Sequence, residues 1–277
     1  MNIISYLNSR GIDTVDSSFY RRIEEWQSWY KARVKGFSFY RVYSGQGTYN
    51  KRRRKSLGMA KKVCEDIADL LLNEKVVITI DDIPTNDFVQ NVLKRNRFFV
   101  VGNEYQERKA YTGTAAYIPH LDNMEIDEAG NVHSGEININ YVSGLGIYPI
   151  SWHNGIVTEC AFAFTKTVNR KKYVHIQFHI LENGEYVIEN AVLECQSGSR
   201  EGKKLTPEEW KNLKPFKNLV QKIYTGSSEP QYVIDKLNSV NNADDDESNP
   251  MGIAIFANAI DVLKKMDIEY DSYSNEF

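Results

Sequence analysis

Residues 173–194 read YVHIQFHILENGEYVIENAVLE, and this stretch decides the fold class of the chain. Apolar and polar side chains alternate on both sides of Glu182-Asn183-Gly184-Glu185, which is the period of a β-strand. Asparagine and glycine accept the positive φ angles of a tight turn, so the stretch predicts a β-hairpin with strands over 173–181 and 186–194.

The same period extends toward the N-terminus. Further strands are predicted over 98–101, 109–118, 124–126, 136–142 and 157–165, with a second turn at 128–131. Because the connections are short, the strands are expected to form an antiparallel meander rather than βαβ units.

Helical periods flank this central region. Phe19, Ile23, Trp26 and Tyr30 recur at spacings of three and four, so a helix is predicted over 18–32. A second helix is predicted over 57–72, a short strand over 76–80, and a third helix from Asp82 or Pro84, with Phe88, Val89, Val92 and Leu93 facing inward. The chain is thus predicted to begin with helices and to belong to the α+β class.

The C-terminal third is expected to return to helix. Thr206-Pro207-Glu208-Glu209 has the pattern of a capping box with proline at the first helical position. Another helix is predicted over 231–240, and a long final helix is predicted from Met251 after an Asn249 cap. The predicted organisation is therefore one domain over 1–248, with helices in 18–96, strands in 97–195, helices in 206–240 and an acidic linker at 241–248, followed by the helix of 249–277.

Composition excludes several classes of protein. The net charge of −3 and the pI of about 6.0 argue against a surface that grips nucleic acid everywhere. Three widely spaced cysteines without a CxxC pair argue against a disulfide framework and a zinc site. The first residues lack a signal-peptide pattern, and no apolar run is long enough to span a bilayer, so a location inside a cell without a membrane segment is expected.

Candidate catalytic residues do not form a recognisable set. His175 and His179 lie four apart on a predicted strand, about 13 Å from each other, which is too far to share one metal ion. We interpret them as strand-surface residues, His153 as a turn residue, and Cys160 and Cys195 as small core residues. The glycine-rich stretch at 143–146 is not followed by a predicted helix, so it does not resemble a phosphate loop. We therefore predict no catalytic residue, no metal and no cofactor.

The sharpest electrostatic feature is the run Lys51-Arg52-Arg53-Arg54-Lys55, which follows an aromatic, glycine-containing arm at 36–50. It can contact phosphates or another acidic partner, through Lys51, Arg52, Arg53 and Arg54. The alternative is a solvated loop ahead of a helix.

Several segments, in order, resemble portal proteins of tailed phages that infect Gram-positive bacteria, of the type with a long N-terminal wing. They are RRIEEWQSWYKARVKGFSFYRV (21–42), RRRKSLGMAKKVCEDIADLLLNEKVVITI (52–80), NDFVQNVLKRNRFF (86–99), GEININYVSGLGIYPISWHNG (135–155) and SNPMGIAIFANAIDVLKKMDIEYDSYSNEF (248–277). Residues 1–248 would then be the portal wing, and 249–277 the start of the stem helix. The clip, the second stem helix and the crown are expected to be absent.

The resemblance implies a structural protein of the virion, assembled in the host bacterial cytoplasm. It implies a ring, usually of twelve subunits, at one capsid vertex, with double-stranded DNA passing along its axis. The implied partners are other copies of the chain, the major capsid and scaffold proteins, the terminase and head-completion proteins. Lys264 and Lys265 would face the channel or lie between subunits, and the acidic residues at 244–247 would repel phosphates.

Two alternatives remain open. One is a portal fragment that forms no ring, binds nucleic acid or an acidic partner through its basic run, and interferes with phage assembly. The other is a hydrolase, which would need a cleft that brings His153, Cys160 or paired carboxylates together.

Overall fold

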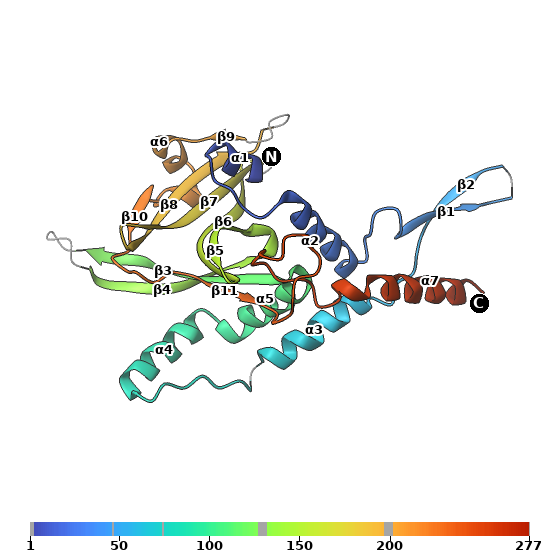
Figure 1. The fold of residues 1–277 in the computed structure, drawn as a ribbon, viewed down its shortest axis with the longest axis horizontal. Coiled ribbons are helices and arrows are strands. Elements are labelled where there is room, and N and C mark those ends of the chain that lie inside the picture. Colours follow the sequence, from blue (N-terminus) through green and yellow to red (C-terminus); the bar gives the residue numbers. More distant parts are fainter. Residues whose placement is uncertain (1–2, 46, 74, 127–131, 197–201, 277) are drawn as a thin grey trace. The chain divides into compact units, whose positions relative to one another are not determined.

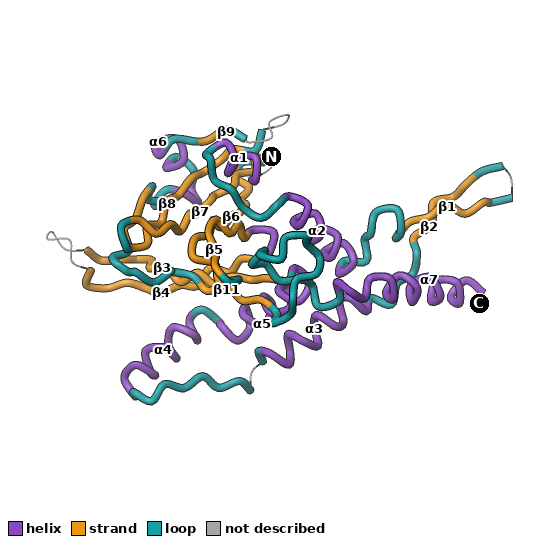
Figure 2. The backbone as a smooth tube through the Cα atoms, in the orientation of Figure 1, coloured by secondary structure: helices purple, strands orange, loops and turns teal. Residues whose placement is uncertain are grey.

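The computed structural model describes residues 3–45, 47–73, 75–126, 132–196 and 202–276 (Figure 1). The chain divides into two compact units. The sheet unit comprises residues 1–17, 115–235 and 246–251, and the helical unit comprises 18–114, 236–245 and 252–277. Helices and strands together give an α+β protein, as predicted (Figure 2).

The sheet unit is built on the predicted meander. Strands β5 (Ile147–His153), β6 (Ile156–Val168), β7 (Lys171–Glu182) and β8 (Glu185–Glu194) pair antiparallel in sequence order. The β7–β8 turn has positive φ at Asn183 (51°) and Gly184 (86°), which confirms the hairpin prediction. Short strands β10 (Lys222–Tyr224) and β9 (Lys203–Lys204) both pair with β8.

A second sheet of the described chain has the order β11-β3-β4. It contains β3 (Thr114–Ile126), β4 (Val132–Ser143) and β11 (Val233–Lys236). The 3-10 turn η1 (Gly144–Gly146) leads from β4 into β5. The turn predicted at 128–131 lies outside the described residues.

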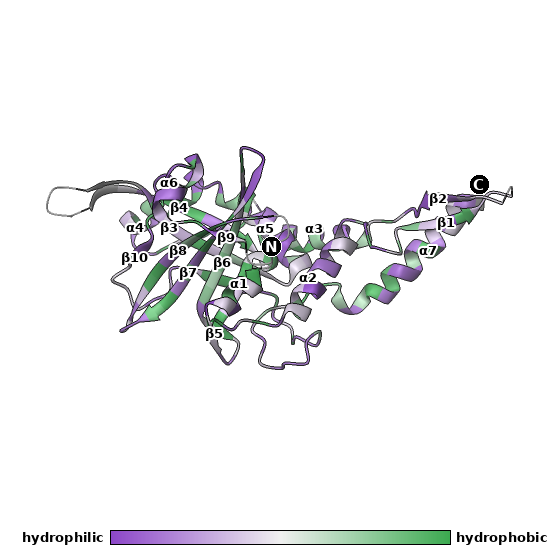
Figure 3. Ribbon diagram, turned by 90° about the horizontal axis from the view of Figure 1, so that it is seen from above, coloured by the Kyte–Doolittle hydropathy of each residue, from purple (hydrophilic) through white to green (hydrophobic). Residues whose placement is uncertain are grey.

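Buried apolar residues of β6 to β8 form the core of the sheet unit. Phe162, Ile176 and Phe178 are fully buried, and Figure 3 shows hydrophobic segments along these strands. Helix α6 (Pro207–Lys211) covers one part of this sheet, because Trp210 packs with Tyr173 and Val192. The predicted capping box at Thr206 and Glu209 is present, followed by the turn η2 (Lys214–Phe216); α1 (Ile3–Ser9) completes the unit.

The helical unit contains α2 (Ser17–Tyr30), the hairpin β1 (Phe39–Tyr43) and β2 (Tyr49–Arg53), α3 (Met59–Leu71), α4 (Ile83–Arg95), α5 (Phe98–Thr112), the turn η3 (Ala257–Ala259) and α7 (Ile260–Glu276). The predicted helices over 18–32 and 57–72 are confirmed. The third predicted helix is α4, capped by Asp82, but Phe88 is exposed and the expectation that it faces inward was wrong.

Three strand predictions were wrong. Residues 76–80 are extended but pair with no strand, because side chains of α4 take their backbone groups: Gln90 Nε2 donates to Ile78 O, and Ile80 N donates to Asn86 Oδ1. Residues 98–101 open helix α5, and the strand expected from residue 109 begins only at Thr114. The apolar run at 98–101 continues into helix-forming residues, and α5 packs against α3 along Gly102.

Two helix predictions were also wrong. Residues 233–236 form strand β11 rather than a helix, because β3 offers them a free edge. The last helix begins at Ile260 rather than at Met251. Residues 251–254 are buried in irregular backbone, where Gly252 N donates to Thr114 Oγ1 and Ile255 N donates to Ala110 O.

Candidate interaction surface on the β1–β2 hairpin

The basic run lies mostly in a β-hairpin. Strands β1 and β2 pair with Phe39 opposite Arg53, Tyr40 opposite Arg52 and Arg41 opposite Lys51. The interpretation of residues 51–53 as a loop was therefore wrong, although Lys51 and Arg53 are exposed. Directly opposite residues share one face of a hairpin, so this register sorts the side chains into two sets.

The first set faces helix α7. Tyr40 hydroxyl donates to Asp271 Oδ2 at 2.7 Å, and Arg54 Nη1 lies 3.9 Å from the same oxygen. Arg52 donates to Asn275 Oδ1. The guanidinium of Arg54 also lies over the rings of Phe37 and Tyr40, at 4.6 and 4.9 Å from their centroids. These contacts place β1–β2 beside α7 (Figure 1).

Asp271 joins the hairpin to α7. Its side chain is almost fully buried, and the backbone N–H of Lys55 donates to Oδ1 at 2.9 Å. Burial alone would raise the pKa of this carboxyl, but the hydrogen bonds from Lys55 and Tyr40 and the charges of Arg54 and Arg52 outweigh burial, and the pKa is lowered. One turn earlier, buried Asp267 accepts from the backbone N–H of Leu57 at 3.0 Å. Asp271 thus remains charged and holds the basic strand in place.

The second set faces away from α7 and is exposed. It contains alternating cations and aromatic rings: Phe39, Arg41, Tyr43, Tyr49, Lys51 and Arg53. Tyr43 and Tyr49 pack edge to face, and Lys51 lies over the ring of Phe39 at 4.6 Å. We call these six residues the outer hairpin face. This face was not predicted, although the alternating residues on both sides of Gly45 and Gly47 in the sequence are a signal for a hairpin.

Lys264 and Lys265 are both exposed on α7. Leu263, Asp267 and Asp271 form the buried face of this helix. Because successive helical residues are rotated by about 100°, Lys265 lies on the opposite face and Lys264 on its flank. The two lysines therefore do not form one patch, and neither is paired with the hairpin among the contacts of the described residues.

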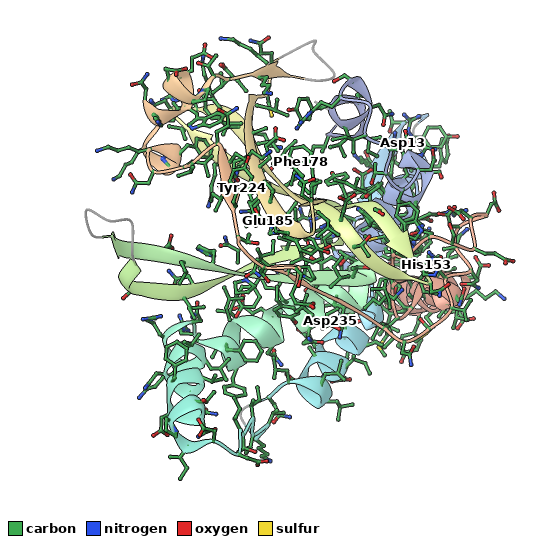
Figure 4. All side chains as sticks on the ribbon, turned by 60° about the vertical axis from the view of Figure 1, so that its left-hand side comes forward. Asp13, His153, Phe178, Glu185, Tyr224 and Asp235 are labelled. Carbon is green, nitrogen blue, oxygen red and sulfur yellow. The ribbon has the colours of Figure 1, made fainter. Side chains whose placement is uncertain are left out.

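The residues considered for catalysis do not converge. Cys160 is fully buried in the core, as expected, while Cys195 is only half-buried. His153 ends β5, and Figure 4 shows it apart from the three carboxylates that the view labels in the same unit, Asp13, Glu185 and Asp235. The prediction that His175 and His179 lie on a strand is confirmed, since both belong to β7.

The interpretation of these two histidines as surface residues was wrong. His179 is fully buried between the rings of Phe162 and Tyr232, and burial lowers its pKa to about 4. Burial also lowers the pKa of His175, against a 2.7 Å hydrogen bond to Asn190. Both are neutral core residues near pH 7.

Within the described ranges, no cluster of histidine, cysteine and carboxylate side chains could hold a metal ion. In the same ranges, every helix is too short or too polar to cross a bilayer.

A comparison with protein families matches residues 11–277 to the family described as "Phage portal protein, SPP1 Gp6-like". The chain belongs to this portal family. A comparison with curated proteins finds no match. The predicted resemblance to portals of tailed phages of Gram-positive bacteria is therefore confirmed, and it covers all but the first ten residues. The portal family is structural rather than enzymatic, and a portal is a component of the phage particle.

Proposed function

We propose that this portal chain is a ring subunit at one vertex of the capsid, and that double-stranded DNA is packaged and ejected along the ring axis. The observation that carries the proposal is the family match over 11–277, because it includes both structural units and helix α7. The partners in this proposal are other copies of the chain, the major capsid and scaffold proteins, the terminase and head-completion proteins. Assembly takes place in the bacterial cytoplasm.

We also propose that Lys264 and Lys265 lie at the channel wall or between subunits. Lys265 is exposed opposite the side of α7 that Leu263, Asp267 and Asp271 bury, and Lys264 is exposed on the flank of that side, which supports this proposal. Asp261 and Glu269 lie one turn before and after Lys265, so this face of α7 carries more negative than positive charge. Such a surface repels phosphates and lets DNA slide.

Electron microscopy of the purified chain tests the proposal. Closed rings with a central opening are expected, and discrete monomers or open filaments in every preparation would contradict it. The variant Lys264→Glu/Lys265→Glu separates the two positions: rings are lost if the lysines lie between subunits and are kept if they line the channel. Lys214→Glu/Lys217→Glu, which changes two exposed lysines of the sheet unit by the same charge, is the matched control.

A further inference from the structure

The hairpin concentrates positive charge in a chain that is otherwise acidic. Residues 39–55 contain six lysines and arginines and no aspartate or glutamate. Since the whole chain has a net charge of −3, the remainder has a net charge of −9. Another copy of this chain is therefore an acidic partner for the hairpin.

The outer hairpin face carries positive charge that the described chain does not compensate. Arg41 lies directly opposite Lys51, and like charges at opposite positions of two strands destabilise their pairing. On the inner side Asp271 offsets the charge of Arg54, but no ion pair of the described residues involves Arg41, Lys51 or Arg53. An acidic surface that covers this face would remove the repulsion.

The exposed aromatic rings of the outer hairpin face are typical of a surface that contacts another protein. Phe39, Tyr43 and Tyr49 are 45%, 57% and 65% exposed. Tyrosine and arginine together are enriched at the points of protein interfaces that contribute most binding energy. A contact limited to charge would not need three exposed rings between the cations.

An acidic surface lies at the other end of α7 in the same unit. Arg22, Glu25 and Asp261 line a hollow of about 320 Å³, together with Trp26, Asn242 and Ala243, so carboxylates outnumber cations in its lining. Arg22 pairs with Glu25 at 3.6 Å, and Asp245, two residues beyond Ala243, is exposed. The hairpin contacts α7 at Asp271 and Asn275, so about 15 to 21 Å of helix separates these contacts from Asp261. Opposite charges therefore lie at opposite ends of one rigid element.

We propose that the outer hairpin face binds the acidic surface around Asp245 and Asp261 of a second copy, head to tail. A head-to-tail contact leaves one free surface at each end, so repetition of it generates a ring or a filament. The proposal rests on the proposed function, for which it names one contact between subunits. Nucleic acid is the less favoured occupant, since the net charge of −9 on the rest of the chain repels phosphates and attracts another hairpin.

Two charge-reversed variants test the contact. Lys51→Glu/Arg53→Glu destroys the hairpin surface, and Asp245→Lys/Asp261→Lys destroys the acidic surface. Each variant alone is expected to self-associate at least roughly tenfold more weakly than the unmodified chain in sedimentation velocity. An equimolar mixture restores opposite charges at both junctions between unlike variants, one native and one reversed, and is expected to form dimers and larger species that weaken as salt is raised. Lys214→Glu/Lys217→Glu is the control, and thermal melting verifies that each variant folds.

Three outcomes overturn the proposal. The first is unchanged self-association of both variants, and the second is a mixture that stays monomeric. The third is that Lys51→Glu/Arg53→Glu binds a 20-base-pair duplex DNA more weakly than the unmodified chain does, while its self-association is unaffected. Normal rings from both variants would remove this contact but leave the proposed function intact. If the mixture associates but the unmodified chain never forms closed rings, the result supports the contact and contradicts the proposed function.

Discussion

At the scale of single residues, His179 is the least expected feature of the sheet unit. Neither of its ring nitrogens has a hydrogen-bond partner among the described residues. Its folded pKa of about 4 lies below the ordinary value of 6.5, because burial disfavours the charged ring. The unfolded chain therefore binds a proton as the pH falls below 6.5, while the folded chain does so only near pH 4. The stability that neutral His179 contributes is therefore fully present above pH 6.5, and it is lost as the pH falls from 6.5 to about 4.

We predict that His179→Phe removes this part of the acid sensitivity. The difference of about 2.5 pH units corresponds to about 3 kcal/mol of unfolding free energy lost by the unmodified chain between pH 7 and pH 4. Urea unfolding of both proteins at pH 7, 5.5 and 4 measures the difference. His153→Phe, the same change of residue type at an exposed position, is the matched control. Parallel pH curves for the unmodified chain and His179→Phe would show that His179 binds its proton at the same pH in the folded and the unfolded chain, which would contradict the prediction.

Gly113 and Gly252 face each other where the chain returns to the end of α5. Gly113 has a φ of 81°, and a Cβ there would lie 2.1 Å from Gly252 O. A Cβ on Gly252 would lie 2.3 Å from Gly113 O. We predict that Gly113→Ala lowers the unfolding free energy by about 3 kcal/mol or more, since it adds both backbone strain and a collision. Exposed Gly184 also has positive φ but no atom within 4 Å of such a Cβ, so Gly184→Ala should cost only about 1 kcal/mol. Equal losses in thermal melting would contradict the steric explanation.

The sequence could predict the fate of Cys160 but not that of the β7 histidines. An alternating pattern identifies a strand, but it tells which face is buried only when the other face is solvated. In β7 both faces are covered at some positions, since Ile176 and Phe178 alternate with the buried ring of His179. Tyr232, which covers His179, comes from a segment that was predicted to be helical.

At the scale of elements, the junction between the hairpin and α7 depends on Asp271. We predict that Asp271→Ala frees the hairpin, because the Tyr40 hydroxyl, the Lys55 N–H and the Arg54 guanidinium lose a shared buried acceptor. The loss is about 2 kcal/mol, and it falls on the local opening of β1–β2 rather than on the sheet unit.

Amide hydrogen exchange measures this change directly. Amides of β1 and β2 should exchange roughly 30-fold faster in Asp271→Ala, while amides of β6 to β8 keep their protection. Glu269→Ala, on the exposed side of α7, is the control. Equal protection of β1 and β2 in both variants would show that the hairpin is held without this carboxylate.

Local patterns predicted the elements whose signals lie within one segment. The helices at 18–32 and 57–72 have long apolar stripes, and the 182–185 turn has the asparagine and glycine that its φ angles require. The elements that were wrong depend on distant partners. The segment 233–236 becomes a strand because β3 leaves an edge beside it, and 251–255 stays irregular because α5 and Thr114 take its backbone groups. No local period contains that information.

The candidate surface shows the same division. The charge at 51–55 was evident from the sequence, and so was its possible contact with an acidic partner. The sequence did not show that alternate residues separate into Arg52 and Arg54, which contact α7, and Lys51 and Arg53, which face outward. That separation requires the strand register and the position of Asp271, which lies more than 200 residues further along the chain.

At the scale of the whole molecule, the portal assignment makes self-association the central property of the chain. Ring subunits need two different surfaces that complement each other, and the helical unit offers a basic hairpin at one end of α7 and carboxylates at the other. The net charge of the whole chain is only −3, because the positive charge of the hairpin offsets most of the negative charge elsewhere in the chain.

Light scattering of the purified chain over a hundredfold range of concentration measures its solution mass and so tests whether the chain assembles into rings. We expect a concentration-dependent rise from 31.9 kDa to a plateau of about 380 kDa for a ring of twelve. The plateau should fall to smaller species at high salt, since charge contributes to the contact. A constant mass of 31.9 kDa at every concentration and at low salt would contradict the claim that this chain assembles as a ring subunit.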